Sequence, residues 1–366
     1  MSLNKSASVI GLGAVAFPLL VSAACGCGSR QTGDVYVMTN NANSNTIAAF
    51  YVNNSGTLVS TSRAEGTKGK GSGSSTNPLN SQGALAVSRD GKWLIALNAG
   101  SNEISLFSTS NRKLAFTSKI GSMGQFPASV ATNGNRVFVL NKRGMTPGIY
   151  GFSFNKKGEL TAIDKEKAVR QLAQSANYSQ IGISPNGKWL VVCNESTNML
   201  IAYALNGDTI AKDSLTLETS GSGPSAFAFD KRNNLIVAES SSGTVSSYSL
   251  SNDGIKVITA ALPIGQTRPR WIACNGDYAY TSAIDSGIFP TIRVNNDGQL
   301  TLISNYSAGS SSVTELAINS DGTHLYTFSP KSNTISRFRI EADGKLVLTE
   351  SIPDYFGPYA QGIAAN

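Results

Sequence analysis

The chain has 366 residues, of which 14% are charged and 40% hydrophobic, and it contains 36 glycines. An average soluble protein is about 25% charged, so this composition excludes a charged coiled coil and a solvating disordered chain. Its 30 lysines and arginines against 23 acids give a formal net charge of +7, but the cations are scattered among the acids, and we expect no nucleic-acid partner.

The first residues have the pattern of a secretory signal peptide. Lys5 precedes an apolar stretch, residues 7–24, that ends in small side chains, and a segment of this kind directs export and is then removed. We therefore expect residues 1–24 to be a signal peptide and residues 25–34 a tether. The mature protein is predicted to be extracytoplasmic.

The four cysteines are too few for a disulfide framework in a chain of this length. Cys25 and Cys27 follow the apolar stretch at once, which resembles a bacterial lipoprotein signal, although Ser22 stands where that pattern has an aliphatic residue. Two alternatives stay open: free secretion, or a membrane tether through Cys25 or Cys27. Cys193 and Cys274 lie in apolar strand-like runs and are expected to be buried thiols, with a disulfide between them as the alternative.

Internal similarity dominates the rest of the chain. Each copy has an apolar strand, a tight turn carrying Asp-Gly, Asn-Gly or Asn-Asn, a second strand, a polar loop, an alternating third strand and a weaker fourth strand. The copies lie at residues 81–107, 179–203 and 314–338, with weaker ones at 128–152, 225–248 and 271–293. Period-two alternation with Gly/Asn turns indicates antiparallel strands. Four strands in about 40 to 50 residues is typical of a propeller blade.

The blade count follows from the second strands, which are expected to begin near residues 35, 93, 136, 189, 235, 278 and 325. The sequence therefore predicts an all-β fold, a single seven-bladed β-propeller of four-stranded antiparallel blades over residues 35–366. No first strand precedes the first copy, whereas residues 359–365 resemble the openings of other repeats. We predict that this C-terminal strand completes blade one and closes the ring, which removes two open sheet edges.

Two insertions interrupt the repeats. Residues 66–78 are rich in glycine and serine, and this composition predicts a mobile loop. No helix longer than a turn is expected, and residues 164–174 are the one segment expected to hold a helical insertion.

A candidate site lies on the face that carries the loops after the second strands, where rigid scaffolds usually present their chemistry. Glu195 and Glu239 are expected at equivalent positions of blades four and five, near Arg268 and Arg270 at the start of blade six. Carboxylates and guanidiniums around one depression suit an anionic or hydroxylated small molecule, with a carboxylate as base and an arginine holding an oxyanion. The candidate catalytic residues are Glu239, Arg268 and Arg270, and the candidate substrate-binding residues are Glu195, Asn177, Gln180 and Asn141. The alternative is that they are solvated loop charges of little energetic consequence.

The sequence lacks the motifs of several common catalytic and cofactor sites. The only histidine, His324, lies in a strand pattern near the opposite face, which argues against a Ser-His-Asp triad and a histidine metal site. The glycine-rich residues 69–75 lack the ending of a phosphate-binding loop. We expect no cofactor and no metal, and a monomer that takes a small-molecule or glycan ligand.

The repeat pattern, best seen at residues 81–105, resembles the seven-bladed β-propeller lactonase family, which includes 6-phosphogluconolactonase-like and 3-carboxymuconate cyclase-like proteins. The resemblance spans about residues 35–366 and implies the fold and a lactonase-like activity. Asn177 and Ser179 stand where family enzymes tend to carry a His-x-His pair, and Ser225-Ala226 stands where an Arg-His is frequent. Of the family's polar site positions that can be matched to this sequence, only Glu239 has the family's residue.

Two functions remain open on this basis. The first is an exported lactonase-like enzyme that hydrolyses a sugar lactone or a related small acid. The second is a non-catalytic propeller that binds a glycan, peptide or envelope partner through the same face.

Overall fold

The computed structural model describes residues 33–61, 64–73, 77–145, 147–174, 176–283, 286–307, 313, 315–353, 356–357 and 359–366. The predicted signal peptide, residues 1–24, lies outside the described residues, as does the tether up to residue 32 with Cys25 and Cys27.

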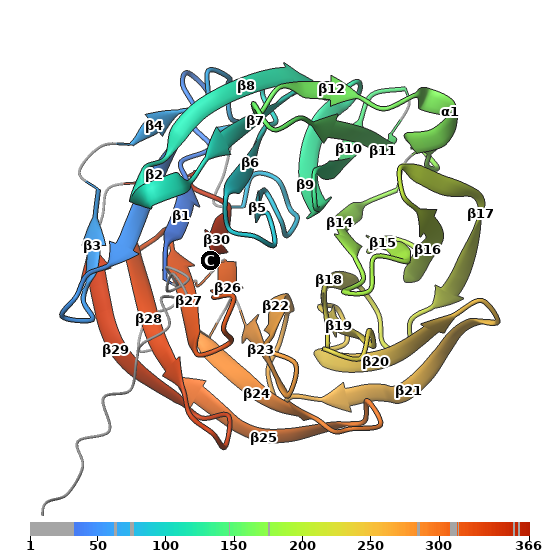
Figure 1. Ribbon diagram of the computed structural model, residues 1–366. Coiled ribbons are helices and arrows are strands. Elements are labelled where there is room, and N and C mark those ends of the chain that lie inside the picture. The colour runs from blue at the N-terminus through green and yellow to red at the C-terminus, as the bar shows by residue number, and fades with distance from the viewer. Residues whose placement is uncertain are drawn as a thin grey trace, which may run out of the picture. The chain divides into compact units, whose positions relative to one another are not determined.

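Seven antiparallel sheets surround a central axis in the part of the chain that the structure describes, and each forms one blade of a ring (Figure 1). Blades one to three contain β1 (Val35–Met38), β2 (Thr46–Val52), β3 (Leu58–Ser60) and β4 (Glu65–Gly66); β5 (Leu85–Val87), β6 (Trp93–Asn98), β7 (Glu103–Ser108) and β8 (Ala115–Gly121); β9 (Gln125–Asn133), β10 (Arg136–Arg143), β11 (Gly148–Phe154), β12 (Leu160–Ala162) and β13 (Val169–Gln171). Blades four and five contain β14 (Tyr178–Ile183), β15 (Trp189–Asn194), β16 (Met199–Asn206) and β17 (Thr209–Glu218); β18 (Pro224–Phe229), β19 (Leu235–Glu239), β20 (Thr244–Ser251) and β21 (Gly254–Pro263). Blades six and seven contain β22 (Pro269–Cys274), β23 (Tyr278–Ala283), β24 (Ile288–Val294) and β25 (Leu300–Ser307); β26 (Glu315–Ile318), β27 (His324–Ser329), β28 (Thr334–Ile340) and β29 (Leu346–Pro353), and β30 (Ile363–Ala365) returns to blade one.

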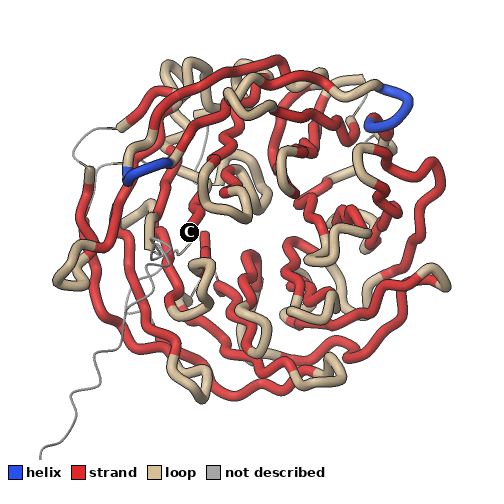
Figure 2. The backbone as a smooth tube through the Cα atoms, viewed as in Figure 1, coloured by secondary structure: helices blue, strands red, loops and turns tan. Residues whose placement is uncertain are grey.

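The predicted all-β propeller is confirmed, because the second strands begin at or within one residue of their expected positions. They start at Val35, Trp93, Arg136, Trp189, Leu235, Tyr278 and His324. Figure 2 shows strands throughout the ring, with helix α1 (Lys165–Ala168) and the 3₁₀ turn η1 (Ser110–Arg112) as the helical pieces drawn. The repeat pattern alone therefore locates each blade.

Burial explains the sequence pattern of each strand position. The second strands β6 and β15 are buried along almost their whole length because a neighbouring blade packs on each of their faces. The outer strand β29 alternates between half-buried and exposed residues over much of its length. Two-sided burial produces continuous apolar runs and one-sided burial produces alternation.

The C-terminal strand closes the ring as predicted. β30 pairs antiparallel with β1 in the register Val35 to Ala365 and Val37 to Ile363. Gln361 N also donates to Met38 O at 3.1 Å. The first and last segments of the propeller therefore share one sheet.

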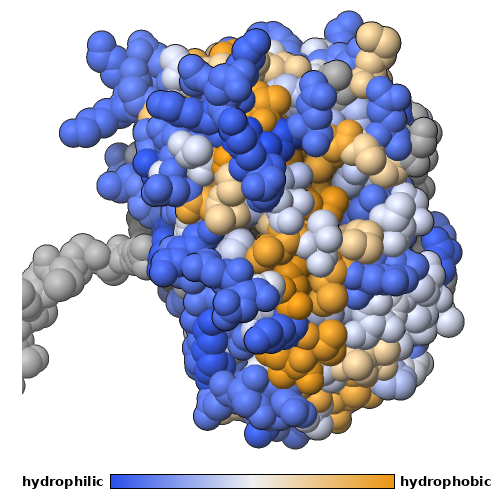
Figure 3. Space-filling model, turned by 90° about the vertical axis from the view of Figure 1, so that its right-hand side faces the viewer, coloured by the Kyte–Doolittle hydropathy of each residue, from blue (hydrophilic) through white to orange (hydrophobic). Residues whose placement is uncertain are grey.

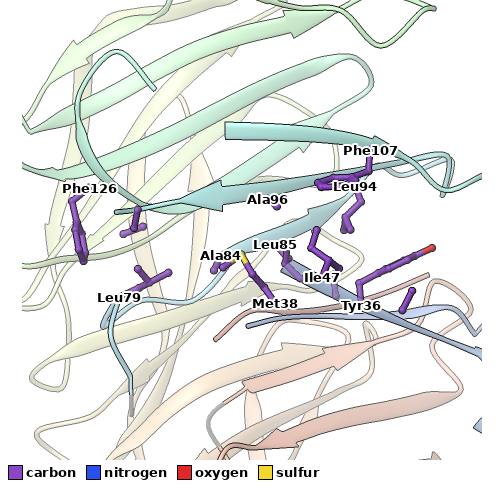
Figure 4. Packing of buried hydrophobic residues seen from close by; sticks show 14 residues of the cluster. Tyr36, Met38, Ile47, Leu79, Ala84, Leu85, Leu94, Ala96, Phe107 and Phe126 are labelled. Carbon is purple, nitrogen blue, oxygen red and sulfur yellow. The ribbon is translucent and has the colours of Figure 1, made fainter. Parts of the chain in front are cut away.

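The hydrophobic core consists of layers between neighbouring blades, and Figure 4 shows the layer between blades one and two. Met38 and Ile47 from blade one pack there with Leu94 from blade two, and none of the three side chains is exposed. Leu79 and Phe126 lie together at one end of the same layer (Figure 4). This end of the layer adjoins the candidate site described below.

The prediction of a mobile loop at residues 66–78 was wrong for its described part. Thr67 is completely buried, and Gly71 N donates to Asn41 O at 2.8 Å. A Cβ atom at Gly71 would lie 2.1 Å from the carbonyl carbon of Asn40, closer than any side chain allows. Glycine is present here because two backbones approach closely, not because the segment is unrestrained.

The helical insertion was predicted correctly, since α1 falls within residues 164–174 and the side chain of Asp164 caps it by accepting Glu166 N at 2.8 Å. Within the described residues, no helix is long and apolar enough to cross a membrane. Cys193 is buried and Cys274 half-buried, and both are free thiols. The alternative of a disulfide between them is therefore excluded.

The rim of the ring carries apolar as well as polar residues. Figure 3 views the side on which α1 and β17 lie and shows a band of apolar residues between hydrophilic ones. The outer strands β17 and β21 bear half-buried Leu215 and Leu217 and exposed Val257. Apolar residues on the rim account for part of the low fraction of charged residues in the chain.

Candidate functional site

A segment that leads into blade two crosses the centre of the ring. Residues 77–83, here called the axial segment, precede β5, and the chain before that strand lies near the axis in Figure 1. Its hydrogen bonds reach blades one, three, four and six: Leu79 N to Gln361 Oε1 at 2.8 Å, Ser81 Oγ to Ala128 O at 2.6 Å, Gln82 N to Ser179 O at 3.1 Å and Gln82 Nε2 to Ile272 O at 2.9 Å. Because it bonds to blades on different sides of the ring, the axial segment fixes the polar groups at the centre.

Arg270 and Glu195 form an ion pair beside the axial segment. Nη1 of Arg270, in β22, donates to Glu195 Oε1 at 2.7 Å, and the two side chains are 15% and 14% exposed. Nη2 of Arg270 donates to the side-chain oxygen of Asn80 in the axial segment. Since Glu195 directly follows β15, these contacts connect blades six, four and two.

The Glu195 carboxylate accepts further hydrogen bonds at both oxygens. Asn177 Nδ2 donates to Oε2 at 2.6 Å, Ser240 Oγ donates to Oε1 at 3.2 Å, and Asn80 Nδ2 approaches Oε2 at 3.5 Å. Charge-assisted hydrogen bonds of this number hold a carboxylate in one orientation. Glu195 therefore acts as a fixed negative charge at the centre of the group.

Lys142, near the end of β10, brings a second cation to this group. Its Nζ donates to two backbone carbonyls of the axial segment, Leu79 O at 3.1 Å and Asn80 O at 3.0 Å. Burial lowers the pKa of Lys142 to about 8, with Arg270 and Arg143 acting in the same direction and Glu195 opposing them. A lysine with such a pKa exchanges its proton close to neutral pH.

We call Asn80, Lys142, Asn177, Glu195 and Arg270 the axial cluster. Burial lowers the pKa of Arg270 from its usual value, the Glu195 carboxylate raises it, and the neighbouring charge of Arg268 lowers it. The guanidinium nevertheless stays protonated, as arginine does throughout the accessible pH range. Two cations around one carboxylate leave the cluster with a positive balance that favours an anion or a developing negative charge.

The predicted equivalence of Glu195 and Glu239 is wrong. Glu239 is the last residue of β19 and pairs with Pro224, just as Asn194 at the end of β15 pairs with Tyr178. The Glu239 side chain is completely buried inside blade five. It accepts from Gly221 N at 2.9 Å, Thr244 Oγ1 at 2.6 Å, Ser246 Oγ at 2.9 Å and Tyr248 Oη at 3.1 Å. These hydrogen bonds connect the loops of blade five to one another, which is a structural role.

Three other predicted residues also lie apart from the cluster. Gln180 is buried and connects blades four and five, since its Nε2 donates to Phe227 O at 2.9 Å and its Oε1 accepts Phe227 N at 2.7 Å. Asn141 is buried and donates to Ser122 O at 2.9 Å. Arg268 is exposed at the edge of the group, with a left-handed φ of 54°. Of the seven candidates, the structure brings together Asn177, Glu195 and Arg270.

Sequence reasoning missed two members of the axial cluster. Lys142 directly follows the candidate Asn141, but nothing in the sequence shows that its side chain contacts a segment from another blade. Asn80 lies two residues after the glycine- and serine-rich segment 66–78, outside every segment that the sequence marks as a candidate site. Its left-handed φ of 46° is a backbone state that asparagine tolerates better than most residues, but the residues around it in the sequence do not show that it reaches the axis.

The cluster can bind and polarise a small oxygen-rich ligand. Arginine and lysine supply N–H donors for a carboxylate or an oxyanion, and the asparagine amides supply donors and acceptors for hydroxyls. Among the described residues, no three His, Cys, Asp or Glu side chains gather as metal ligands.

Comparison with known families gives one match that covers most of the chain. The profile of the family described as "Lactonase, 7-bladed beta-propeller" matches residues 35–171, 145–260 and 237–359. Among curated proteins, an uncharacterized protein of Staphylococcus epidermidis is 23% identical over 244 residues, which is 61% of this chain and 70% of that protein.

Solved structures share the fold at low sequence identity. A candidate 6-phosphogluconolactonase of Bacteroides fragilis has a TM-score of 0.71 and 20% identity, covering 90% of this chain and 98% of that chain. The periplasmic gluconolactonase PpgL of Pseudomonas aeruginosa has a TM-score of 0.69 and 13% identity, covering 91% of this chain and 99% of that chain. At these identities the similarity shows the fold alone.

Proposed function

Because the chain belongs to the seven-bladed β-propeller lactonase family, we propose that it binds a lactone of a hydroxylated small acid at the axial cluster and hydrolyses it. The observation that carries this proposal is the pairing of Arg270 with Glu195 at 2.7 Å next to Lys142, on segments from separate blades. The Arg270 guanidinium, and the Lys142 amine once it has accepted a proton, supply the positive charge that a lactone carbonyl needs when it becomes an oxyanion.

In the proposed reaction, Arg270 donates to the carbonyl oxygen of the lactone and Lys142 acts as general base. Leu79 O and Asn80 O hold two hydrogens of the Lys142 amine, which leaves its remaining position free to exchange a proton. The oxygen of a water molecule adds to the carbonyl carbon while neutral Lys142 takes one water proton. The ring C–O bond then breaks, and the leaving oxygen takes that proton to become the hydroxyl of the product hydroxy acid.

The residue assignments give a clear test with a panel of sugar and alkyl lactones. Arg270→Lys keeps the charge but loses the planar pair of donors, and we expect kcat/KM to fall about 100-fold, the usual effect of removing an oxyanion donor. Arg339→Lys is the matched control, because Arg339 forms an exposed pair with Glu341 at 2.6 Å on blade seven. Hydrolysis that is equally fast in Arg270→Lys and the control would refute the role of Arg270.

Lys142 is tested by the pH profile. For wild type we expect kcat/KM to rise with pH through an apparent pKa of about 8, as the Lys142 amine loses its proton. In Lys142→Met the rate should fall about 100-fold or more and lose this pH dependence, while Lys345→Met on blade seven should behave as wild type. A rise through pH 8 that survives in Lys142→Met would show that another group is the base.

A second candidate function is binding without turnover. It is favoured by the hydrogen bonds that engage Glu195 at both oxygens and by the enclosure of Glu239 within blade five, since neither carboxylate is available as a base. A hydroxy acid, glycan or peptide that binds with an affinity lowered by Arg270→Lys, together with no product from any lactone, would favour this function.

We further propose that the protein acts outside the cytoplasm, either secreted or tethered through Cys25 or Cys27. The sequence pattern of residues 1–24 supports this proposal. Mass spectrometry of the mature N-terminus tests it, because export predicts loss of the first 24 residues and lipidation predicts an acylated cysteine. A mature protein that begins at Met1 would contradict export.

A further inference from the structure

A hollow opens close to the axial cluster, and two exposed methionines line it. Its volume is about 390 Å³, and its walls are Met123, Gly124, Gln125, Arg143, Gly144 and Met145. Met123 is 50% exposed and Met145 84% exposed. Large apolar side chains are rarely presented to water together beside a polar site unless something covers them.

The loop that presents Met123 is held in an unusual backbone conformation. Met123 and Phe126 have left-handed φ angles of 61° and 59°, a state that bulky residues seldom adopt. The side chain of Asn102 accepts Phe126 N at 2.7 Å, and the side chain of Asn141 donates to Ser122 O at 2.9 Å. Strain of this kind persists where the surroundings enforce it and is common at binding sites. The buried Asn141 therefore has a positioning role next to the cluster rather than inside it.

Contacts in the core place the hollow beside the axial cluster. The Arg143 guanidinium lies 3.6 Å from the centre of the Phe126 ring and covers it. Phe126 packs in the same core layer as Leu79, and both lie at one end of it in Figure 4. The carbonyl of Leu79 accepts Lys142 Nζ, so one short stretch of β10 places Lys142 in the cluster and Arg143 in the hollow.

We propose that this hollow is an apolar subsite that takes an unbranched alkyl substituent of the lactone or hydroxy acid held at the axial cluster. The inference rests on the proposed function and specifies its substrate class. Such a ligand has a polar head and an apolar tail, which matches Arg270 and Lys142 on one side and two methionines on the other.

The chemistry of the walls favours an alkyl chain over a sugar or a cationic peptide. Methionine is flexible and polarizable and adapts to aliphatic groups of different length. A sugar ring would need an open aromatic face, but the Phe126 ring is covered by Arg143 and only 8% exposed. Arg143 and Lys142 repel cationic side chains and attract the carboxylate of a hydroxy acid.

The test is a series of γ-lactones that differ in alkyl length: γ-valerolactone, γ-heptalactone, γ-nonalactone and γ-undecalactone. Full burial of one methylene strengthens binding about four-fold; in this open hollow we expect KM to fall about two-fold per added methylene, with little change in kcat. Met123→Gln and Met145→Gln keep the side-chain length and should flatten this dependence. Leu348→Gln, which changes an exposed leucine on β29, is the matched control. A KM that is independent of chain length, or a dependence unchanged in both methionine variants, would overturn the subsite.

Titration calorimetry with hexanoate, octanoate and decanoate separates this inference from the proposed hydrolysis. If affinity rises with chain length in wild type and not in the methionine variants while no lactone is hydrolysed, the subsite stands and the proposed activity fails. If lactones are hydrolysed but neither KM nor the affinity for these carboxylates depends on chain length, the activity stands and the subsite fails.

Discussion

Glu315 provides a quantitative test of how the ring is closed. It opens β26, is 1% exposed, and has one carboxyl oxygen, Oε1, without a hydrogen-bond partner in the structure. Burial raises the pKa of Glu315 from 4.5 to about 8, and hydrogen bonds from Gly362, Ile363 and the Gln361 side chain limit the rise. These partners belong to the closing segment, so the protonation of Glu315 is coupled to ring closure.

The sign of the effect follows from proton linkage. The folded protein binds the Glu315 proton up to about pH 8, whereas the unfolded chain releases it near pH 4.5. The stabilisation is fully present below pH 4.5 and is lost as the pH rises to about 8. At 1.36 kcal/mol per pKa unit, the free energy of unfolding should fall by up to about 3 kcal/mol between pH 4.5 and pH 7 on account of this group.

The test variant is Glu315→Gln, which replaces the titrating carboxyl group by an amide of the same shape. Urea unfolding followed by tryptophan fluorescence at pH 5, 6, 7, 8 and 9 measures the free energy of unfolding. We expect Glu315→Gln to be more stable than wild type at pH 7 to 9 and to show a smaller decline with pH, while Glu218→Gln on exposed β17 should follow wild type. Parallel pH curves for wild type and Glu315→Gln would show that the Glu315 carboxyl does not cause the pH dependence of stability.

Three further predictions concern closure, packing and the buried carboxylate of blade five. Deleting residues 359–366 removes β30 and leaves the inner edge of β1 unpaired, so the melting temperature should drop by about 10 °C or more, at least about three times the roughly 2–4 °C that a 1 kcal/mol loss causes in a large domain; an unchanged value by calorimetry would contradict ring closure. Gly71→Ala places a Cβ atom 2.1 Å from the carbonyl carbon of Asn40 and should lower the urea midpoint of unfolding. Gly56→Ala is the comparison: a Cβ atom there would meet no atom within 4 Å, so its effect should come only from the strained φ of 81°. Glu239→Gln replaces an acceptor of four hydrogen bonds by a group that can accept fewer and should lower stability by about 2 kcal/mol or more; normal stability with lost turnover would indicate instead that Glu239 takes part in catalysis.

The fold was predictable because its determinants are local and repeated. Each second strand is an apolar run such as Trp93–Asn98, and each turn carries a small or flexible residue. The same pattern therefore occurs seven times in the sequence, and each copy supports the assignment of the others. Closure by β30 was predictable because a first strand was missing at one end and surplus at the other. Pattern alone failed at Gly71, where glycine marks a close contact between backbones and not flexibility.

The site was predictable only in part because its contacts join residues far apart in the chain. Arg270, Glu195 and Asn177 were found because charged and amide side chains at loop positions are conspicuous. Glu239 was misplaced because it stands one register position before Glu195: it pairs with Pro224 at the end of β19, as Asn194 pairs with Tyr178 at the end of β15. No local signal reveals that Asn80 reaches the axis.

A crystal structure with bound 4-hydroxyoctanoate would show whether the axial cluster binds a hydroxy acid. This ion is the hydrolysis product of γ-octalactone, so it should occupy the site whether or not turnover is fast. We expect its carboxylate within hydrogen-bond distance of Arg270 Nη and Lys142 Nζ, with the alkyl chain between Met123 and Met145. A ligand that binds elsewhere on the ring, or that leaves both cations without contact, would contradict the assignment of the axial cluster.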